Sequence, residues 1–412
     1  MPLRLLTNHI ALPVYMARNT TLQICQFGFV GRIYMTKSRI PLEKFVKEYS
    51  VRNKLNDDIP VYSVTNSQGF CTEYFSKEVA SQDKTTYKIV PRGYFAYNPS
   101  RINVGSVDWQ KYEDRVIVSP LYNVFSVSDE IDCQYLYYFF RSNIGRQMIK
   151  AKSSGSVRDN LKIEMLKEMT IPDISMREQQ FCSSVLDKLQ ILIKLKCDEI
   201  KQMDELVKAR FVEMFGTEQE MNKWNCCTVG DVADVSVGVV IKPTQYYSDV
   251  GIPAFRSLNV GEMHVNDNDW VYFTREGHEK NKKSIIKNND VLVVRSGAPG
   301  TACVATQKYE GYNAVDIMIA RPYQEKINST FLAAFTNMPH GMNQIKNKTG
   351  GAAQKHFNVR EYKTLTIILP SLEVQQQFAD FVRQADKSKS VIEKSLKELE
   401  TLQASLMQKY FS

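Results

Sequence analysis

A stretch of this sequence is repeated further along the chain, and no other feature constrains the fold as strongly. "SGSVRDNLKI" begins at Ser154 and "GGAAQKHFNV" begins at Gly350. In the same way "DDIPVYSVTN" at Asp57 is matched by "VGIPAFRSLN" at Val250, and the offsets between such pairs run from 193 to 198. A long repeat with small insertions predicts two copies of one folding unit.

Two segments carry the heptad spacing of long helices. Between Phe378 and Leu406, alternate steps of four and three residues meet seven apolar side chains in nine positions. The same spacing runs from Leu186 to Met214, with two basic interruptions. An apolar seam of this kind needs a partner helix, and each segment offers one to the other.

The two predicted helices begin and end with matching phrases. Each starts with an apolar residue and a proline, in "IPDISMREQQF" at Ile171 and "LPSLEVQQQF" at Leu369, followed by a Ser or Asp that can cap the first turn. They end in "EMFG" at Glu213 and "KYFS" at Lys409. Helices of ~35 to 40 residues span ~50 to 60 Å at ~1.5 Å per residue. We expect them to act as rigid spacers.

The stretch before each helix is rich in strand-forming residues and turn chemistry. We therefore expect a mixed α/β fold, with two globular domains separated by two long helices as an internal repeat. The predicted segments are a domain at 35–172, a helix at 173–216, a domain at 217–370 and a helix at 371–412. Residues 1–34 have no counterpart in the second unit, so they are expected to be an appendage or to precede a true start at Met35.

Composition narrows the class of protein only partly. A chain of 412 residues is long enough for more than one core. Its formal net charge of +8 suits a polyanionic partner without requiring one. The eight cysteines form no CxxC pair, which is typical of reduced thiols in a cytoplasmic protein. The sequence has no run of the ~18 apolar residues that spans a bilayer, so no membrane partner is expected.

A search for catalytic motifs finds none that is complete. The five histidines form no HxxxH or HExxH pair. "SGAPGT" at Ser296 is glycine-rich but lacks the Gly-Lys-Ser/Thr of a phosphate-binding loop. "YNPS" at Tyr97 is similar to the Asn-Pro-Pro-aromatic element of amino-methyltransferases, yet it lacks the second proline and the aromatic residue. We predict no catalytic residue, no metal site and no cofactor bound by this chain.

Several predicted loops combine Arg or Lys with Asn, Gln, Ser and Gly, the set that contacts phosphates and reads base edges. The alternative is that each loop is an ordinary turn and each lysine pair is solvated surface. Side chains at matching positions of the two repeats often differ, while the surrounding sequence pattern is the same. This is expected of two domains that recognise different short DNA sequences. The predicted DNA-binding residues of the first unit are Asn66, Ser67, Gln68, Asn98, Arg101, Asn103, Lys150, Lys152, Ser154 and Arg158. Those of the second unit are Arg256, Asn259, Arg295, Ser296, Thr301, Lys346, Lys348, Gln354 and Lys355.

The ordered set of phrases resembles the specificity subunit of type I restriction-modification systems. The resemblance rests on the domain-helix-domain-helix repeat, the two helix-start phrases, "VGDVADVSVG" at Val229 and "YNPSRINVGS" at Tyr97. In the first unit, "RIPLEKFVKEYSVRN" at Arg39 lacks the Gly-Asp found in the second. The first domain is therefore expected to belong to a different recognition subclass.

The resemblance implies a division of labour. Each globular domain would read one half of a bipartite site in double-stranded DNA. The two helices would form an antiparallel coiled coil, related by a pseudo-twofold axis, that sets the half-site spacing and docks two methyltransferase (modification) subunits. Those partners would bind S-adenosylmethionine, and restriction/translocase subunits would use ATP and Mg²⁺.

Two alternatives come from other classes of protein. If the chain were itself a methyltransferase or nuclease, the purified chain alone would modify or cut DNA. If it were a coiled-coil interaction protein, its globular domains would bind protein or RNA. A neighbouring gene for a methyltransferase with an Asn-Pro-Pro-aromatic motif would favour the DNA-reading hypothesis over the second alternative. The bases read, the spacer length and the orientation of the domains on the site stay open.

Overall fold

The chain divides into two compact units. The first unit ends at Leu192 and resumes at Leu399, and the second runs from Ile193 to Glu398. Both boundaries fall inside long helices, so each unit combines a globular domain with part of each helix. The computed structural model describes residues 38–72, 83–153, 160–349 and 357–412.

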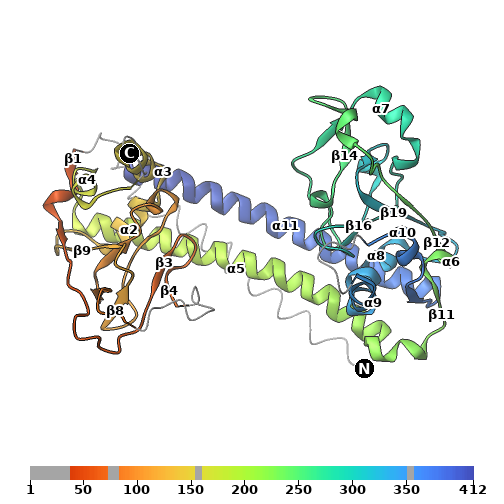
Figure 1. Cartoon of the computed structure of the whole chain (residues 1–412), viewed down its shortest axis with the longest axis horizontal. Coiled ribbons are helices and arrows are strands. Elements are labelled where there is room, and N and C mark those ends of the chain that lie inside the picture. The colour runs from red at the N-terminus through yellow and green to blue at the C-terminus, as the bar shows by residue number, and fades with distance from the viewer. Residues whose placement is uncertain (1–37, 73–82, 154–159, 350–356) are drawn as a thin grey trace. The chain divides into compact units, whose positions relative to one another are not determined.

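Both predicted long helices are present. They are α5 (Met176–Phe215) and α11 (Leu372–Phe411), each a continuous helix of 40 residues (Figure 1). Apolar seam residues are buried in both units, among them Leu186 in the first and Val207 and Val382 in the second. The heptad spacing in the sequence therefore corresponds to packed helix faces.

Polar side chains define how the two helices pair. In the second unit, Lys389 Nζ donates to the Asp204 carboxylate at 2.7 Å. In the first unit, Gln403 Nε2 donates to Gln190 Oε1 at 3.1 Å. From the first contact to the second, the residue on α5 changes from Asp204 to Gln190, which is fourteen residues back. The residue on α11 changes from Lys389 to Gln403, which is fourteen residues, or two heptads, forward. The helices thus run antiparallel in both units with one register, which confirms the predicted coiled coil.

A buried glutamine explains why both long helices begin with the same phrase. In the first unit, Gln179 Oε1 accepts from the backbone N–H of Asp132 at 2.8 Å. In the second unit, Gln375 Oε1 accepts from the backbone N–H of Asn328 at the same distance. Asp132 and Asn328 cap the short helices α2 (Cys133–Arg141) and α8 (Ser329–Asn337). The glutamine therefore fastens the start of each long helix to the domain that precedes it.

A phenylalanine anchors the end of each long helix. Phe215, the last residue of α5, is buried in the second unit with its ring centroid 4.9 Å from that of Phe331. Phe411, the last residue of α11, is buried in the first unit 5.0 Å from the Tyr135 ring. Tyr135 and Phe331 occupy the same place in α2 and α8. Each helix therefore begins in one unit and ends in the other.

The first unit is built on a four-stranded antiparallel sheet ordered β2-β9-β6-β7. Strand β1 pairs with β10, β3 with β4, and β5 with β8. The rings of Phe95 and Phe125 stack at 5.0 Å in the core, against Phe140 of α2. The strands are β1 (Arg39–Pro41), β2 (Val46–Glu48), β3 (Ser63–Thr65), β4 (Gly69–Cys71), β5 (Lys88–Pro91), β6 (Phe95–Tyr97), β7 (Val107–Trp109), β8 (Arg115–Val118), β9 (Asn123–Val127) and β10 (Thr170–Pro172). The helices after α2 are α3 (Asn143–Ser153) and α4 (Ile163–Lys167).

The second unit repeats this plan. Its main sheet is ordered β12-β19-β16-β17, β11 pairs with β20, and a further sheet is ordered β13-β15-β14-β18. The strands are β11 (Cys226–Thr228), β12 (Ala233–Val237), β13 (Tyr247–Ser248), β14 (Ile252–Phe255), β15 (Val271–Phe273), β16 (Val291–Val294), β17 (Ala302–Val304), β18 (Asn313–Ala314), β19 (Ile317–Pro322) and β20 (Thr366–Ile368). The helices besides α8 are α6 (Val229–Val232), α7 (Arg275–Lys280), α9 (Pro339–Thr349) and α10 (Val359–Lys363). Helices α8 to α11 follow α2 to α5 at one constant offset, the same as that between the repeated phrases at Ser154 and Gly350, which confirms the repeat.

The repeated phrases lead into matching contacts. The Leu161 N–H donates to the Pro99 carbonyl at 3.1 Å, and the Phe357 N–H donates to the Arg295 carbonyl at 3.2 Å. Both side chains, Leu161 and Phe357, are fully buried. In each unit the segment after the repeated loop is therefore held to the loop that follows the central strand, β6 or β16.

Candidate nucleic-acid interface

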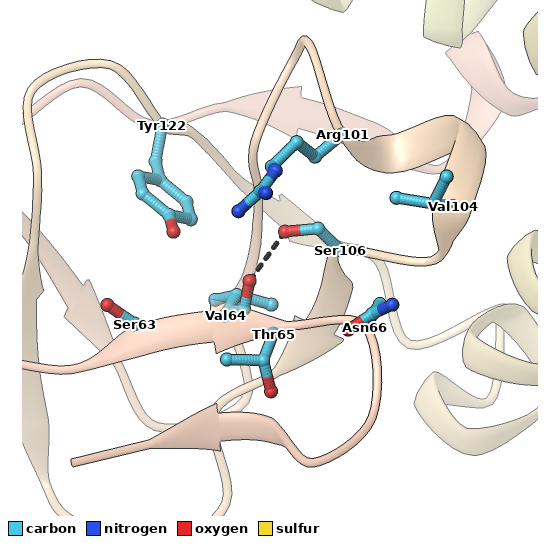
Figure 2. Close-up of a pocket in the computed structure, with 8 residues that line it drawn as sticks. All are labelled: Ser63, Val64, Thr65, Asn66, Arg101, Val104, Ser106 and Tyr122. Carbon is cyan, nitrogen blue, oxygen red and sulfur yellow. Dashed lines mark hydrogen bonds between the residues drawn. The ribbon is translucent and has the colours of Figure 1, made fainter. Parts of the chain in front are cut away.

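Two of the predicted binding loops meet in the first unit. Asn66, Ser67 and Gln68 form the exposed turn between β3 and β4. Arg101 lies in the loop after β6, just before the 3-10 helix η3 (Ile102–Val104). Residues from both loops line a pocket of about 200 Å³ (Figure 2).

Arg101 is the cation of this pocket. Figure 2 shows its side chain reaching from its loop toward Tyr122 and Val64. Ser106 Oγ donates to the Val64 carbonyl at 2.5 Å and so joins strand β3 to the segment between η3 and β7. Among the described residues, no ion pair or hydrogen bond uses the Arg101 guanidinium. An exposed cation in a pocket that also contains an aromatic side chain suits phosphate or base contact.

An arginine that the sequence analysis missed holds the two loops together. Arg141, the last residue of α2, donates to the Asn66 carbonyl at 2.5 Å and to the Gly105 carbonyl at 3.3 Å. Gly105 has a φ of 100°, a backbone conformation that residues with a side chain rarely adopt. The positions of the two loops are therefore determined by α2 rather than by either loop alone.

A buried aspartate fixes the other side of the Asn66–Gln68 turn. The Asp108 carboxylate is 2% exposed and accepts from the Phe70 N–H at 3.1 Å and the Trp109 N–H at 2.8 Å. Burial raises the pKa of the Asp108 carboxyl above its usual value. Gly69 lies against this carboxylate with a φ of 68°. Arg141 therefore holds the Asn66 end of the turn, and Asp108 holds the end that leads into Phe70.

The other predicted residues of the Arg101 loop have different surroundings. Asn98 Oδ1 accepts from the N–H and the hydroxyl of Ser100, at 3.1 and 2.9 Å. This is an Asx turn that shapes the loop. Asn103 is exposed on η3. Asn98 therefore supports the loop through its side-chain oxygen, while Asn103 is open to a ligand.

The predicted lysine pairs occupy matching places in α3 and α9. Lys152 forms an ion pair with Glu168 at 2.5 Å, and Lys348 donates to Thr364 Oγ1 at 3.0 Å. These two lysines hold their helices to the segments that follow α4 and α10. The exposed lysines on the same turns are Lys150 and Lys346.

In the second unit, the Arg256 loop uses its polar groups internally. Arg256 donates to the Asp269 carbonyl at 2.5 Å and lies 3.2 Å from the Asp269 carboxylate. Asn259 is fully buried and donates to the carbonyls of Asn266 and Asn268. Asn259 sits where the first unit has the exposed Asn66, so matching positions in the two frames differ in exposure.

The tight turn after β16 is likewise held from within. Arg295 pairs with Asp316 at 2.6 Å and donates to the Phe357 carbonyl at 3.3 Å. Ser296 and Thr301 are half-buried at the two ends of the turn. The predicted residues that lie outside the described part of the chain are Ser154, Arg158, Gln354 and Lys355.

Sequence reasoning missed a second set of cations in the first unit. Lys111, Arg141 and Arg146 line a groove of about 640 Å³ that also includes Ser67 of the Asn66–Gln68 turn. One signal could have found them, namely a comparison of the two repeats position by position. The residue matching Arg146 is Met342, since both stand at the fourth position of their helices, α3 and α9.

The described residues contain no group of three or more His, Cys, Asp or Glu placed to hold a metal ion. No helix in the described ranges is both long enough and apolar enough to cross a membrane. The polar chemistry on these loops is that of hydrogen bonding and charge.

The fold and its loops define a duplicated recognition scaffold, in which one frame occurs twice with different side chains on it. The sequence model of the family described as "Type I restriction modification DNA specificity domain" matches residues 42–204 and 221–401. The chain therefore belongs to this family. The expected family membership is confirmed.

Individual relatives are distant. The chain is 24% identical over 277 residues to the specificity subunit of the type I restriction enzyme MjaIX from Methanocaldococcus jannaschii, covering 62% of each chain. It is 22% identical to the EcoKI specificity subunit from Escherichia coli over 67% of this chain and 64% of that one. These matches span less than two thirds of the relatives' lengths. The solved S subunit of a type I system from M. genitalium aligns with a TM-score of 0.52 and 14% identity, over 92% of this chain and 97% of that one.

Proposed function

We propose that this chain is the DNA sequence-recognition subunit of a type I restriction-modification complex. Each globular domain reads one half of a bipartite site in double-stranded DNA. The observation that carries the proposal is the repeated frame with unlike loops, because one frame suits one geometry of approach and different side chains suit different bases. Multiplying two half-site discriminations gives a specificity that one small domain does not reach.

In the first unit, the proposed contacts centre on the Asn66–Gln68 turn and Arg101. Their side chains are exposed, and the groups behind them, Arg141 and Asp108, hold the loops in place. Rigidly held loops keep their ordering cost low on binding. Exposed amides can read base edges, while the guanidinium contacts phosphate or a guanine edge.

The second half of the proposal concerns partners. Two identical modification subunits need the same docking surface twice. The long helices offer such a repeat of exposed apolar side chains, since Leu195 and Val391 are 52% and 71% exposed, and Leu206 and Leu402 are 46% and 39% exposed. The members of each pair occupy the same position in α5 and in α11. We assign S-adenosylmethionine to these partners, and ATP with Mg²⁺ to the restriction/translocase subunits.

The helical pair is proposed to set the distance between half-sites, and this idea has a direct test. Seven-residue heptad insertions after Asp198 and after Lys394 lie at matched positions, opposite each other in the antiparallel register. Seven residues add about 10 Å of helix, which is about three base pairs at ~3.4 Å each. Mapping methylated adenines in a host that carries the complete system should show unchanged half-sites and a spacer longer by about three base pairs.

The outcomes separate the two parts of the proposal. A spacer of unchanged length would refute the ruler. Absence of any recurrent methylated motif with the unaltered chain would refute DNA reading itself. The control carries the insertion in α5 alone, which shifts the pairing of Lys389 with Asp204 by one heptad and should abolish methylation rather than move it.

A further inference from the structure

Each unit has a groove between its globular domain and its share of the long helices, at the same place in the repeat. The first groove, of about 640 Å³, is lined by residues that include Gln134, Asp187 and Gln190. The second groove, of about 450 Å³, is lined by residues that include Thr330, Arg383 and Asp386. Each of these three holds the same position in its helix as its counterpart in the first unit. The two grooves are therefore duplicates in position.

Their linings differ in charge. The first groove contains Lys111, Arg141 and Arg146, while Asp187 is its one acid among the described lining residues. The aligned positions in the second unit are occupied by neutral side chains. The pairs are Lys111 with Thr306, Arg141 with Asn337, and Arg146 with Met342.

Local geometry supports this alignment. Gly105 and Gly300 have φ values of 100° and 93° at the same point of the frame. A side chain added at Gly105 would lie nearest the Arg146 guanidinium, and one added at Gly300 would overlap Ile345 and the Met342 sulfur. Arg146 and Met342 therefore occupy one place, once charged and once apolar.

The cations of the first groove are only partly neutralised. The Asp187 carboxylate already accepts from the Tyr138 hydroxyl at 2.6 Å and from Gln134 at 2.8 Å. Lys111 lies 3.7 Å from Asp108. Within the described ranges, Arg141 donates to peptide carbonyls, which leave its charge in place. Among the described residues, no ion pair or hydrogen bond uses the exposed Arg146 guanidinium.

The cations also gather around one aromatic ring. Lys111 Nζ lies 5.5 Å and Arg141 Cζ 5.1 Å from the centroid of the Tyr137 ring. Two cations near one ring repel each other, and an anion between them would lower that cost. Ser67 of the Asn66–Gln68 turn also lines this groove. An anion in this groove would thus sit next to the proposed base-reading loop.

We propose that the first groove binds the sugar-phosphate backbone of DNA through Lys111 and Arg146, and that its duplicate in the second unit does not. This inference rests on the proposed function. A modification subunit that docks twice needs features that occur twice, and these cations occur once. DNA suits the difference because its two half-sites are unlike. The first groove therefore adds a salt-dependent contribution to DNA binding that its duplicate in the second unit does not add.

The test uses the chain assembled with its modification subunits and a fluorescein-labelled duplex of mixed sequence. Each phosphate contact contributes about 0.9 to the slope of log affinity against log salt. The double variant K111T/R146M imports the side chains of the second unit and should lower the slope by about 1.8. The single variant R146M should lower it by about 0.9. The control R383Q removes a cation from the second groove and should leave the slope unchanged.

The outcomes are distinct. An unchanged slope for K111T/R146M overturns the inference. So does loss of copurification with the modification subunits, because the groove would then be a protein-docking surface. Adenine mapping runs in parallel and should return the same methylated motif for the variants. If the unaltered complex methylates no recurrent motif, the proposed function fails, while the slope on the mixed-sequence duplex still tests the groove.

Discussion

The change Gly69→Ala tests how the Asn66–Gln68 turn of the first unit is held in place. Gly69 ends the Asn66–Gln68 turn at a φ of 68°. A Cβ there would overlap Oδ2 of the Asp108 carboxylate. That oxygen accepts from the Phe70 N–H at 3.1 Å and is buried. The substitution must therefore displace a buried, hydrogen-bonded carboxylate.

The expected loss has two parts. Forcing alanine into a left-handed conformation costs about 1 kcal/mol. Losing one hydrogen bond to a buried charged group costs about 1.5 to 3 kcal/mol more. We expect G69A to lower the free energy of unfolding of the first unit by about 2.5 to 4 kcal/mol. The turn would shift, so recognition of the first half-site should weaken as well.

The matched control is Gly93→Ala. Gly93 has a φ of 85°, and a Cβ there would meet nothing within 4 Å. G93A should therefore lose only the conformational part, about 1 kcal/mol. Urea unfolding followed by circular dichroism measures both variants in the full chain. Equal losses for G69A and G93A would refute the claim that Asp108 fixes the turn.

Two further predictions concern charge inside the second unit. Lys389 occupies an apolar seam position, and its side chain is 16% exposed. The urea midpoint of K389L should therefore equal or exceed that of the original chain, whereas D204A leaves the lysine without its carboxylate and should lower the free energy of unfolding by about 1 kcal/mol. A clearly lower midpoint for K389L would contradict this. Burial lowers the pKa of His340, a residue that is 1% exposed and whose ring packs near those of Phe211 and Phe335. The unfolded chain therefore takes up the proton first as pH falls, and stability should decline below about pH 6.5. H340Q should flatten that decline between pH 7.5 and 5.5, and an unchanged slope would show that other groups cause it.

The features predictable from the sequence are those that a repeat or a period encodes. The heptad spacing gave the two long helices, whose observed bounds lie within three residues of the predicted 173–216 and 371–412. The repeated "QQ" of the helix starts was visible as a pattern, but its reason was not. Gln179 and Gln375 act on the caps of α2 and α8, more than forty residues earlier in the chain. A contact of that sequence separation leaves no local signal.

The candidate interface was harder to predict because residue type does not determine use. Asn66 and Asn259 are the same residue at matching places, yet one is exposed and the other makes its hydrogen bonds inside its own loop. Arg101 and Arg295 lie in matching loops, yet the second is neutralised by Asp316. Polar groups that satisfy the backbone and polar groups that meet a ligand are drawn from one set of amino acids.

The duplication itself separates these two uses better than residue type does. A contact that appears in both units, such as the glutamine at each helix start, is needed by the frame, because it persists while the neighbouring loops change. A feature that appears in one unit and not in the other is not needed for the shared fold. Lys111 and Arg146, facing Thr306 and Met342, fall in this second group. Since the frame folds without charge at these places in the second unit, the charge in the first unit calls for a reason outside folding, and a polyanionic ligand supplies one.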